Sequence, residues 1–174
     1  MSAPWEQPGR APSQHQVARE LRAIVNRAQD IAAERGAAST EAEHLLLAIA
    51  EFPQSRGAVF LADNGLGAEG LEAAFRAERE HALGGVGVTG FRDADLAATP
   101  RRRKPRWGTS ARESWERGFR MMRGGREHVS SLNLVVGALS AELGTVPRAL
   151  SLAGVDRHKL LGQALIEATT GLTR

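Results

Sequence analysis

The chain has 174 residues, a formal net charge of +3 and a hydrophobic content of 42%. This length suits one domain of ordinary size, or two small halves fused into one body. Because there is no cysteine, disulfides, thiolate zinc sites, iron–sulfur clusters and cysteine nucleophiles are all excluded. Ala and Leu dominate the apolar residues, and aromatic residues reach only 5%. This composition favours helices over sheet.

Targeting signals and charge restrict the class of protein further. No stretch approaches the roughly 18 consecutive apolar residues that a membrane helix requires. Residues 1–12 lack the apolar run of a signal peptide, so we expect a soluble, cytoplasmic protein. The isoelectric point is about 10.4, but a net charge of only +3 gives little weight to nucleic-acid binding.

The first half of the chain has the apolar spacing of four helices. Residues 1–13 are interpreted as a disordered leader. After them, apolar residues recur at helical spacing until Gly36, a residue type that commonly ends a helix. The hydroxyls of Ser39 and Thr40 are expected to cap the next helix, and Pro53 to end it. The predicted helices cover residues 14–35, 44–51, 58–64 and 68–83.

The middle of the chain has the composition of a linker, over residues 84–108. It is rich in Gly at its start and ends in a basic run, TPRRRKPR, at residues 99–106. Trp115, Phe119 and Met122 then share one face of a predicted helix. Core packing explains this face, and an exposed partner groove is the alternative. The predicted helices of the second half cover residues 109–122, 132–143, 147–152 and 157–168, with a break at Gly124 and Gly125.

The second half repeats the first at a nearly fixed offset. A shift of 89 residues places His44 and the apolar residues after it on residues 133–137, and it places Gly65 on Gly154. Upstream of Gly36 the shift becomes 91. An offset that holds across four successive elements indicates an internal duplication.

The residues around Glu43 are similar to a known repeat. They read EHLLLAI over residues 43–49, after a glycine and Thr40, and an L-x-x-x-G-L pattern follows at residues 61–66. This order resembles the Clp repeat, two copies of which make the N-terminal domain of ClpA-, ClpB- and ClpC-type unfoldases. The second copy keeps the apolar skeleton, and the resemblance covers roughly residues 16–168.

The resemblance implies a compact, pseudo-twofold, all-α bundle of about eight helices. Its two four-helix repeats would be residues 14–83 and 109–170, together forming one domain that docks adaptors and substrates for an attached ATPase. This chain has no G-x-x-x-x-G-K-[ST] loop, the phosphate cradle that binds ATP. We therefore expect a non-catalytic protein- or peptide-binding module of the Clp system without a cofactor. It would be an adaptor, a substrate decoy or a regulator of a ClpC-type unfoldase.

In the ClpC branch, the resemblance also implies recognition of phosphoarginine by a Thr and a Glu in each repeat. Glu43 matches the first Glu, but the matching Thr position is Ala18. Thr109 can match the second Thr, but the matching Glu position is Leu132. Because a bidentate carboxylate is the main specific way to hold a guanidinium, these departures argue against phosphoarginine recognition.

No catalytic or metal-binding constellation is apparent in the sequence. Glu43 and His44 could form an acid–base pair, but a structural His and a helix-capping Glu43 are favoured. The histidines have neither H-x-x-x-H nor H-E-x-x-H spacing, so we expect no metal site. There is no G-x-S-x-G nucleophile elbow either.

The candidate ligand-binding residues are therefore Glu43, Thr109 and Trp107. A possible basic contact patch comprises Arg101, Arg102, Arg103, Lys104 and Arg106. A solvated linker is the simpler interpretation of this run. The alternative function is a nucleic-acid-associated regulator, in which the patch contacts phosphates. Trp107 would then stack on a base, or it could anchor an acidic partner.

Overall fold

The computed structural model describes residues 13–87, 99–120 and 129–170. Within these ranges the chain is an all-α bundle of eight packed helices, as the composition predicts. The elements are α1 Gln14–Glu34, β1 Ser39–Thr40, α2 Ala42–Ala50, α3 Arg56–Asp63, α4 Ala68–Gly85, β2 Arg106–Trp107, α5 Thr109–Arg120, α6 Ser131–Leu139, α7 Thr145–Leu152 and α8 Arg157–Thr170.

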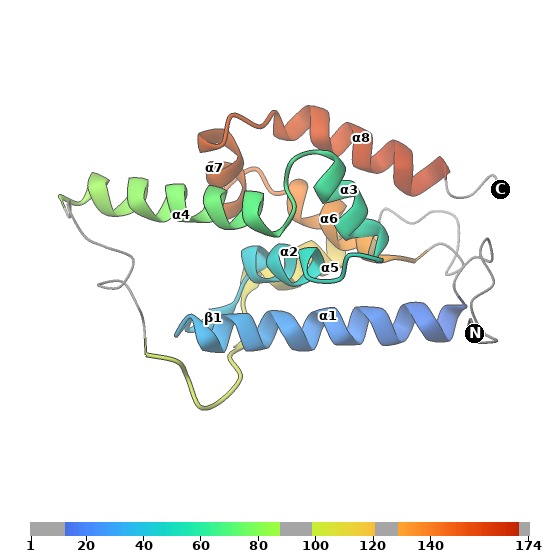
Figure 1. Ribbon diagram of the computed structural model, residues 1–174, viewed down its shortest axis with the longest axis horizontal. Helices are drawn as coiled ribbons and strands as arrows, with labels where there is room; N and C mark the ends of the chain where they lie inside the picture. Colours follow the sequence, from blue (N-terminus) through green and yellow to red (C-terminus); the bar gives the residue numbers. More distant parts are fainter. Residues whose placement is uncertain (1–12, 88–98, 121–128, 171–174) are drawn as a thin grey trace, which may run out of the picture.

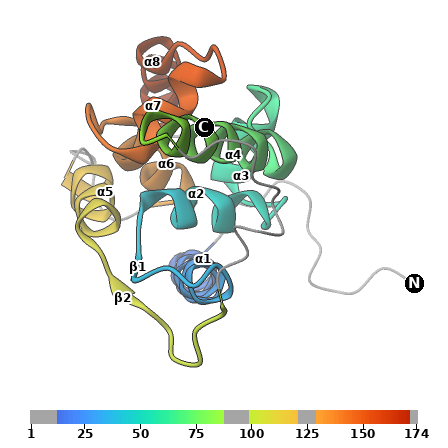
Figure 2. The same cartoon turned by 90° about the vertical axis from the view of Figure 1, so that its left-hand side faces the viewer.

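The helices are arranged around a central pair, α2 and α6. Figure 1 shows α1 along one side of the molecule, α2, α5 and α6 in the middle, and α4, α7 and α8 on the opposite side. The helix α2 packs against α1, α3, α4, α5 and α6, while α6 packs against α5, α8, α3, α2 and α7. Figure 2, viewed nearly along α1, shows the short parallel pair of β1 and β2 at the edge between α1 and α5.

The helix boundaries repeat with the offset found in the sequence. The helices α6, α7 and α8 begin 89 residues after α2, α3 and α4. Gly65 and Gly154, which follow α3 and α7, have φ of 73° and 71°, a backbone conformation that glycine adopts at little cost. After each of them, the next backbone N–H donates to the helix, from Leu66 to Leu61 O and from Val155 to Leu150 O.

Several boundaries differ from the sequence-based expectations. The predicted helix over residues 132–143 ends earlier, at Leu139, where the Ser140 hydroxyl donates back to Val136 O at 2.7 Å and competes with the helix ladder. Ser13, assigned above to the leader, is the N-cap of α1. Residues 1–12 and 121–128, which include Met122 and the Gly124–Gly125 break, lie outside the described residues.

The two central helices form the core of the molecule. Every residue of α6 is buried, as are seven of the nine residues of α2. The helix α5 lies unusually close to α6, because Gly118 and Gly137 provide the contact surfaces. A Cβ added to Gly118 would lie 2.1 Å from Asn133 O, and one added to Gly137 would lie 1.8 Å from Ser114 O.

The close approach of α5 and α6 predicts that Gly137→Ala destabilises the protein. The new methyl group would meet backbone rather than a movable side chain, so we expect a loss of about 1–3 kcal/mol or more in the free energy of unfolding, measured by urea denaturation. Gly162→Ala is the matched control. A Cβ there meets nothing within 4 Å, so this change should stabilise α8 by about 0.5–1 kcal/mol. Equal changes in the free energy of unfolding for both variants would show that the contact between α5 and α6 does not exclude a methyl group at Gly137.

Candidate functional site

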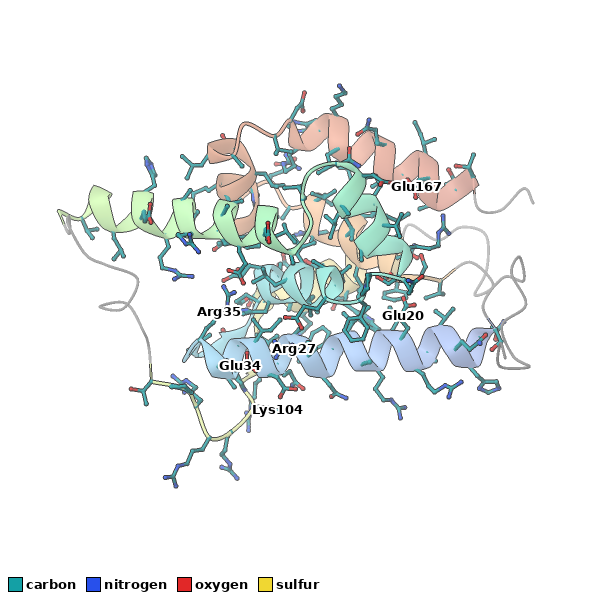
Figure 3. The ribbon with its side chains drawn as sticks, in the orientation of Figure 1. Glu20, Arg27, Glu34, Arg35, Lys104 and Glu167 are labelled. Carbon is teal, nitrogen blue, oxygen red and sulfur yellow. The ribbon has the colours of Figure 1, made fainter. Side chains whose placement is uncertain are left out.

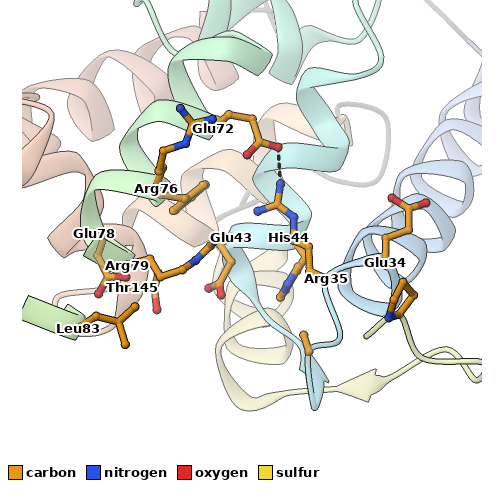
Figure 4. A pocket seen from close by; sticks show the side chains of 13 residues that line it. Glu34, Arg35, Glu43, His44, Glu72, Arg76, Glu78, Arg79, Leu83 and Thr145 are labelled. Atoms are coloured by element: carbon orange, nitrogen blue, oxygen red, sulfur yellow. Dashed lines mark hydrogen bonds and ion pairs between the residues drawn. The ribbon is translucent and has the colours of Figure 1, made fainter. Parts of the chain in front are cut away.

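A cavity of about 950 Å³ lies where the end of α1, the start of α2, one face of α4 and the start of α7 meet. We call it the α2–α4 cavity, and Figure 4 shows it from close by. Its lining is rich in charge and carries some apolar surface. The residues that matter below are Glu34, Arg35, Glu43, His44, Glu72, Phe75, Arg76, Glu78, Arg79, Leu83, Pro100 and Thr145.

Three of the four glutamates in the cavity are paired with arginines. Arg35 pairs with Glu72, as the dashed line in Figure 4 marks. Glu78 accepts from Arg148 Nε at 2.8 Å, which joins α4 to α7. Glu34 pairs with Arg27 at 2.7 Å. The charges of these three carboxylates are therefore already compensated by the protein.

Glu43 is the exception among the described glutamates of this cavity, since it has an ion pair with none of the described residues. Its side chain is half-buried in the first turn of α2. Burial raises the pKa of Glu43, and the nearby charges of Glu41 and Glu78 add to this effect. The backbone N–H of Glu43 itself and the charge of Arg35 act in the opposite direction, but the effect of burial is larger. A carboxylate that is partly removed from water and has no ion pair with the described residues is suited to receive a cationic or hydrogen-bond-donating group.

His44, next to Glu43, has a structural position. It is 4% exposed, and its Nδ1 accepts a hydrogen bond of 2.9 Å from the backbone N–H of Glu41. Burial, and then the positive charge of Arg35, lower the pKa of His44 to about 4. The ring is therefore neutral at pH 7 and closes the capping box of α2.

The N-cap residue of α2 is Glu41, so the expectation of a cap from Ser39 or Thr40 was wrong. The first backbone N–H of α2, that of Ala42, donates instead to the hydroxyl of Ser110 at 2.9 Å. The Glu41 carboxylate accepts from the backbone N–H of Ser110 at 3.1 Å, from the Ser110 hydroxyl at 2.6 Å and from the Ser39 hydroxyl at 2.6 Å. Burial alone would raise the pKa of Glu41, but these hydrogen bonds outweigh it and lower the pKa. Ser110 comes from α5, so the cap joins the two halves.

The second half shows which of these features the fold requires. Asn133 occupies the position of His44 and makes the same bond, accepting from the backbone N–H of Ser130 at 2.9 Å. In contrast, five charged or aromatic positions of the α2–α4 cavity are apolar 89 residues later, whereas Glu78 corresponds to Glu167. Glu43, Glu72, Phe75, Arg76 and Arg79 correspond to Leu132, Leu161, Ala164, Leu165 and Ala168. The bundle thus forms with Leu and Ala at these positions.

The other predicted site residues lie elsewhere. Thr109 is the exposed first residue of α5, and Trp107 is half-buried in β2; neither lines the α2–α4 cavity. The Trp107 and Trp115 rings meet edge to face with their centroids 5.8 Å apart, and the centroids of the Trp115 and Phe119 rings are 4.5 Å apart. Trp115 and Phe119 are half-buried against the core. Their exposure is intermediate between the two predictions, core packing and an exposed partner groove.

The basic run lies along α1 and is anchored to it. The backbone N–H of Arg101 donates to Ala33 O at 2.8 Å, and Lys104 Nζ lies 2.9 Å from Asp30. The buried Pro105 accepts from Gln29 at 3.4 Å through its carbonyl. Figure 3 shows Lys104 beneath α1 near Arg27 and Glu34. This segment therefore differs from the solvated linker that composition suggests.

The α4 residues of the cavity were missed at the sequence level. A signal was present, because Glu72, Phe75, Arg76, Arg79 and Leu83 recur at the spacing of one helix face. A mixed charged and apolar face has no distinctive motif, however. Only the packing of α4 beside the start of α2 shows that this face meets Glu43.

Comparison with known proteins adds no assignment. No family model matches the chain. No curated protein matches it either. In the parts of the chain that the structure describes, no three His, Cys, Asp or Glu side chains are grouped to hold a metal ion. None of the described helices is long and apolar enough to cross a membrane.

The low pKa of His44 predicts a loss of stability in mild acid. Unfolding restores the ordinary pKa of 6.5, whereas the folded value is about 4. The unfolded state therefore binds the proton first as the pH falls. The free energy of unfolding should decrease from about pH 6.5 downward, by up to about 3 kcal/mol near pH 4, as followed by urea denaturation at a series of pH values.

His44→Asn is the matched variant for this prediction, since Asn133 makes the same bond in the second half. The variant should stay folded at pH 7 and lose most of the acid dependence between pH 6.5 and 4.5. The raised pKa of Glu43 acts in the opposite direction, but it is common to both proteins and cancels in the comparison. An unchanged pH dependence in the variant would show that His44 is not responsible.

The unpaired charge of Glu43 predicts that Glu43→Leu, which installs the residue of the second half, stabilises the protein. Removing a partly desolvated carboxylate should raise the free energy of unfolding at pH 7 by about 0.5–2 kcal/mol, measured by urea denaturation. Glu80→Leu, at an exposed position of α4 outside the cavity lining, should change it little. Loss of stability in Glu43→Leu would indicate that this carboxylate holds the fold together.

Proposed function

We propose that this chain is a non-catalytic protein-binding module that takes a peptide segment of its partner into the α2–α4 cavity. We further propose that it acts in the cytoplasm with a Clp-type unfoldase, as an adaptor, substrate decoy or regulator. The observation that carries the proposal is the state of Glu43, a half-buried carboxylate without an ion-pair partner among the described residues.

The comparison of the two halves supports a role in binding for the charged lining. Leu and Ala occupy five equivalent positions of the second half, so packing alone does not require charged or aromatic residues at those five positions. Charged groups that are costly to bury and unnecessary for the fold are typical of functional sites. The cavity volume of about 950 Å³ is at the upper end of the range for ligand sites and leaves room for more than one peptide side chain.

The lining also indicates what the peptide carries. Glu43 can accept two hydrogen bonds from a guanidinium, or pair with an ammonium group. Phe75 and Leu83 offer apolar surface for the aliphatic stem of such a side chain. Arg35, Arg76 and Arg79 also line the cavity, so the cation that we assign to the partner is one that pairs with Glu43 itself, a lysine or an arginine.

The environment of His44 supports binding without turnover. Its Nδ1 is occupied by the backbone N–H of Glu41, and its pKa of about 4 keeps it unprotonated at neutral pH. A general acid or base works best with a pKa near the working pH and with access to the reacting group. His44 has neither property.

The assignment to the Clp system rests on the resemblance of the sequence. The EHLLLAI segment lies in α2, and the corresponding segment of the second half lies in α6. These are the two helices at the centre of the bundle. Because the sequence has no ATP-binding loop, the role proposed for this chain is to bind an unfoldase or its substrates. This is why an adaptor, a decoy and a regulator are the three forms of the proposal.

Glu43→Gln tests the binding site directly. We expect the unaltered protein to select lysine- or arginine-containing peptides from a random-peptide array, and Glu43→Gln to weaken that binding about tenfold. Fluorescence anisotropy with the selected peptides gives the affinities. Glu80→Gln, a change on the exposed face of α4, is the control and should bind normally. Equal affinities for all three proteins would refute the proposed site.

Affinity capture from the native cytoplasm tests the Clp assignment. The immobilised protein should retain a ClpC-type unfoldase, its peptidase or its substrates, and Glu43→Gln should retain much less of them, as quantified by mass spectrometry. Repeated capture of nucleic acid alone, by both proteins equally, would refute this part of the proposal.

A further inference from the structure

The basic run is held in place rather than free. Besides the bond from its backbone N–H to α1, Arg101 donates from Nε to Gly36 O at 3.2 Å. The carbonyl of Pro105 accepts from the Thr40 hydroxyl at 3.3 Å, and β2 pairs with β1 directly afterwards. We call residues 101–106 the basic loop. Its position is fixed by contacts at both of its ends.

These anchors leave much of its positive charge uncompensated. Lys104 is paired with Asp30, but Arg102, Arg103 and Arg106 are exposed, and their guanidinium groups bond to none of the described residues. Like charges held together on a fixed loop repel one another. A negatively charged partner would relieve this repulsion, and arginine binds carboxylates with two parallel hydrogen bonds.

The basic loop begins at the edge of the α2–α4 cavity. Pro100, the residue directly before it, lines the cavity together with Glu34 and Arg35. Because an extended chain covers about 3.3 Å per residue, a few residues of a peptide suffice to pass from the cavity onto the loop. One continuous peptide can therefore contact both surfaces.

The charges of the two surfaces favour a polypeptide over a nucleic acid. In the cavity next to the loop, Glu43 is the glutamate without an ion pair to the described residues. A peptide can place a cation on Glu43 and carboxylates on the loop, whereas a phosphate backbone has no cation for Glu43. The one aromatic residue adjoining the loop, Trp107, is half-buried and packed edge to face on Trp115. Its partial burial and this ring contact leave it less exposed for stacking on a base than a free loop residue.

We infer that the partner is a polypeptide segment in which an acidic stretch lies directly before or after a lysine or arginine. The acidic stretch binds along Arg102, Arg103 and Arg106. This inference rests on the proposed function, since the cationic residue enters the α2–α4 cavity. It adds the chemistry of the partner: a cation for Glu43, and carboxylates for the basic loop.

The test uses a fluorescent peptide with one arginine, a short glycine spacer and a run of glutamates, and the same peptide with glutamine in place of glutamate. We expect the double variant Arg102→Gln and Arg103→Gln to bind the acidic peptide about three- to tenfold more weakly and with a smaller salt dependence. The glutamine peptide should bind the double variant and the unaltered protein with the same affinity. Arg19→Gln with Arg22→Gln removes the same charge from exposed positions of α1 and is the control.

The remaining outcomes separate the inference from the proposed function. If Glu43→Gln weakens binding but the double loop variant does not, the acidic stretch is wrong and the cavity proposal stands. If neither Glu43→Gln nor the double loop variant lowers the affinity, both the cavity proposal and the acidic stretch are wrong. If duplex DNA binds more tightly than the acidic peptide at about 150 mM salt, and only the loop variant loses it, the basic loop is a nucleic-acid contact and the inference is overturned.

Discussion

The burial of α2 and α6 is the constraint on which the rest of the structure depends. Both helices are nine residues long and lie at the centre, so the backbone donors of their first turns cannot reach bulk water. Such donors must find partners inside the protein. In α2, the backbone N–H of Ala42 donates to the Ser110 hydroxyl, and His44 accepts from the N–H of the N-cap residue Glu41. At α6, Asn133 accepts from the N–H of the N-cap residue Ser130.

The same caps join the two halves into one body. The hydroxyl of Ser110, from α5, accepts from the backbone N–H of Ala42 at 2.9 Å and donates to Glu41. In the other direction, the Ser131 hydroxyl of α6 accepts from the backbone N–H of Gly57 in α3 at 3.0 Å. Each half therefore completes part of the hydrogen bonding of the other, and an isolated half would leave polar groups at its centre without partners.

The duplication explains how a charged cavity could arise within a small bundle. The second half carries Leu132, Leu161 and Leu165 where the first has Glu43, Glu72 and Arg76, so the two copies of one framework have diverged in polarity. Partial burial of an unpaired carboxylate lowers stability, a cost that proteins commonly accept at functional sites. The basic loop belongs to the same half, since it is anchored on α1 and begins at the cavity edge.

Local patterns in the sequence determined the helices, because apolar periodicity and helix-ending glycines act within a few residues of each other. The offset of 89 residues follows from these patterns, whereas Glu43 became a candidate through the resemblance of residues 43–49 to the Clp repeat. The tertiary structure alone decided the rest. Glu41, the N-cap of α2, is bonded by Ser110, which is 69 residues away, and Glu78 is neutralised by Arg148, 70 residues away. No local pattern contains such pairs, and for this reason only the folded chain shows that Glu43 forms no ion pair with the described residues while Glu72 and Glu78 do.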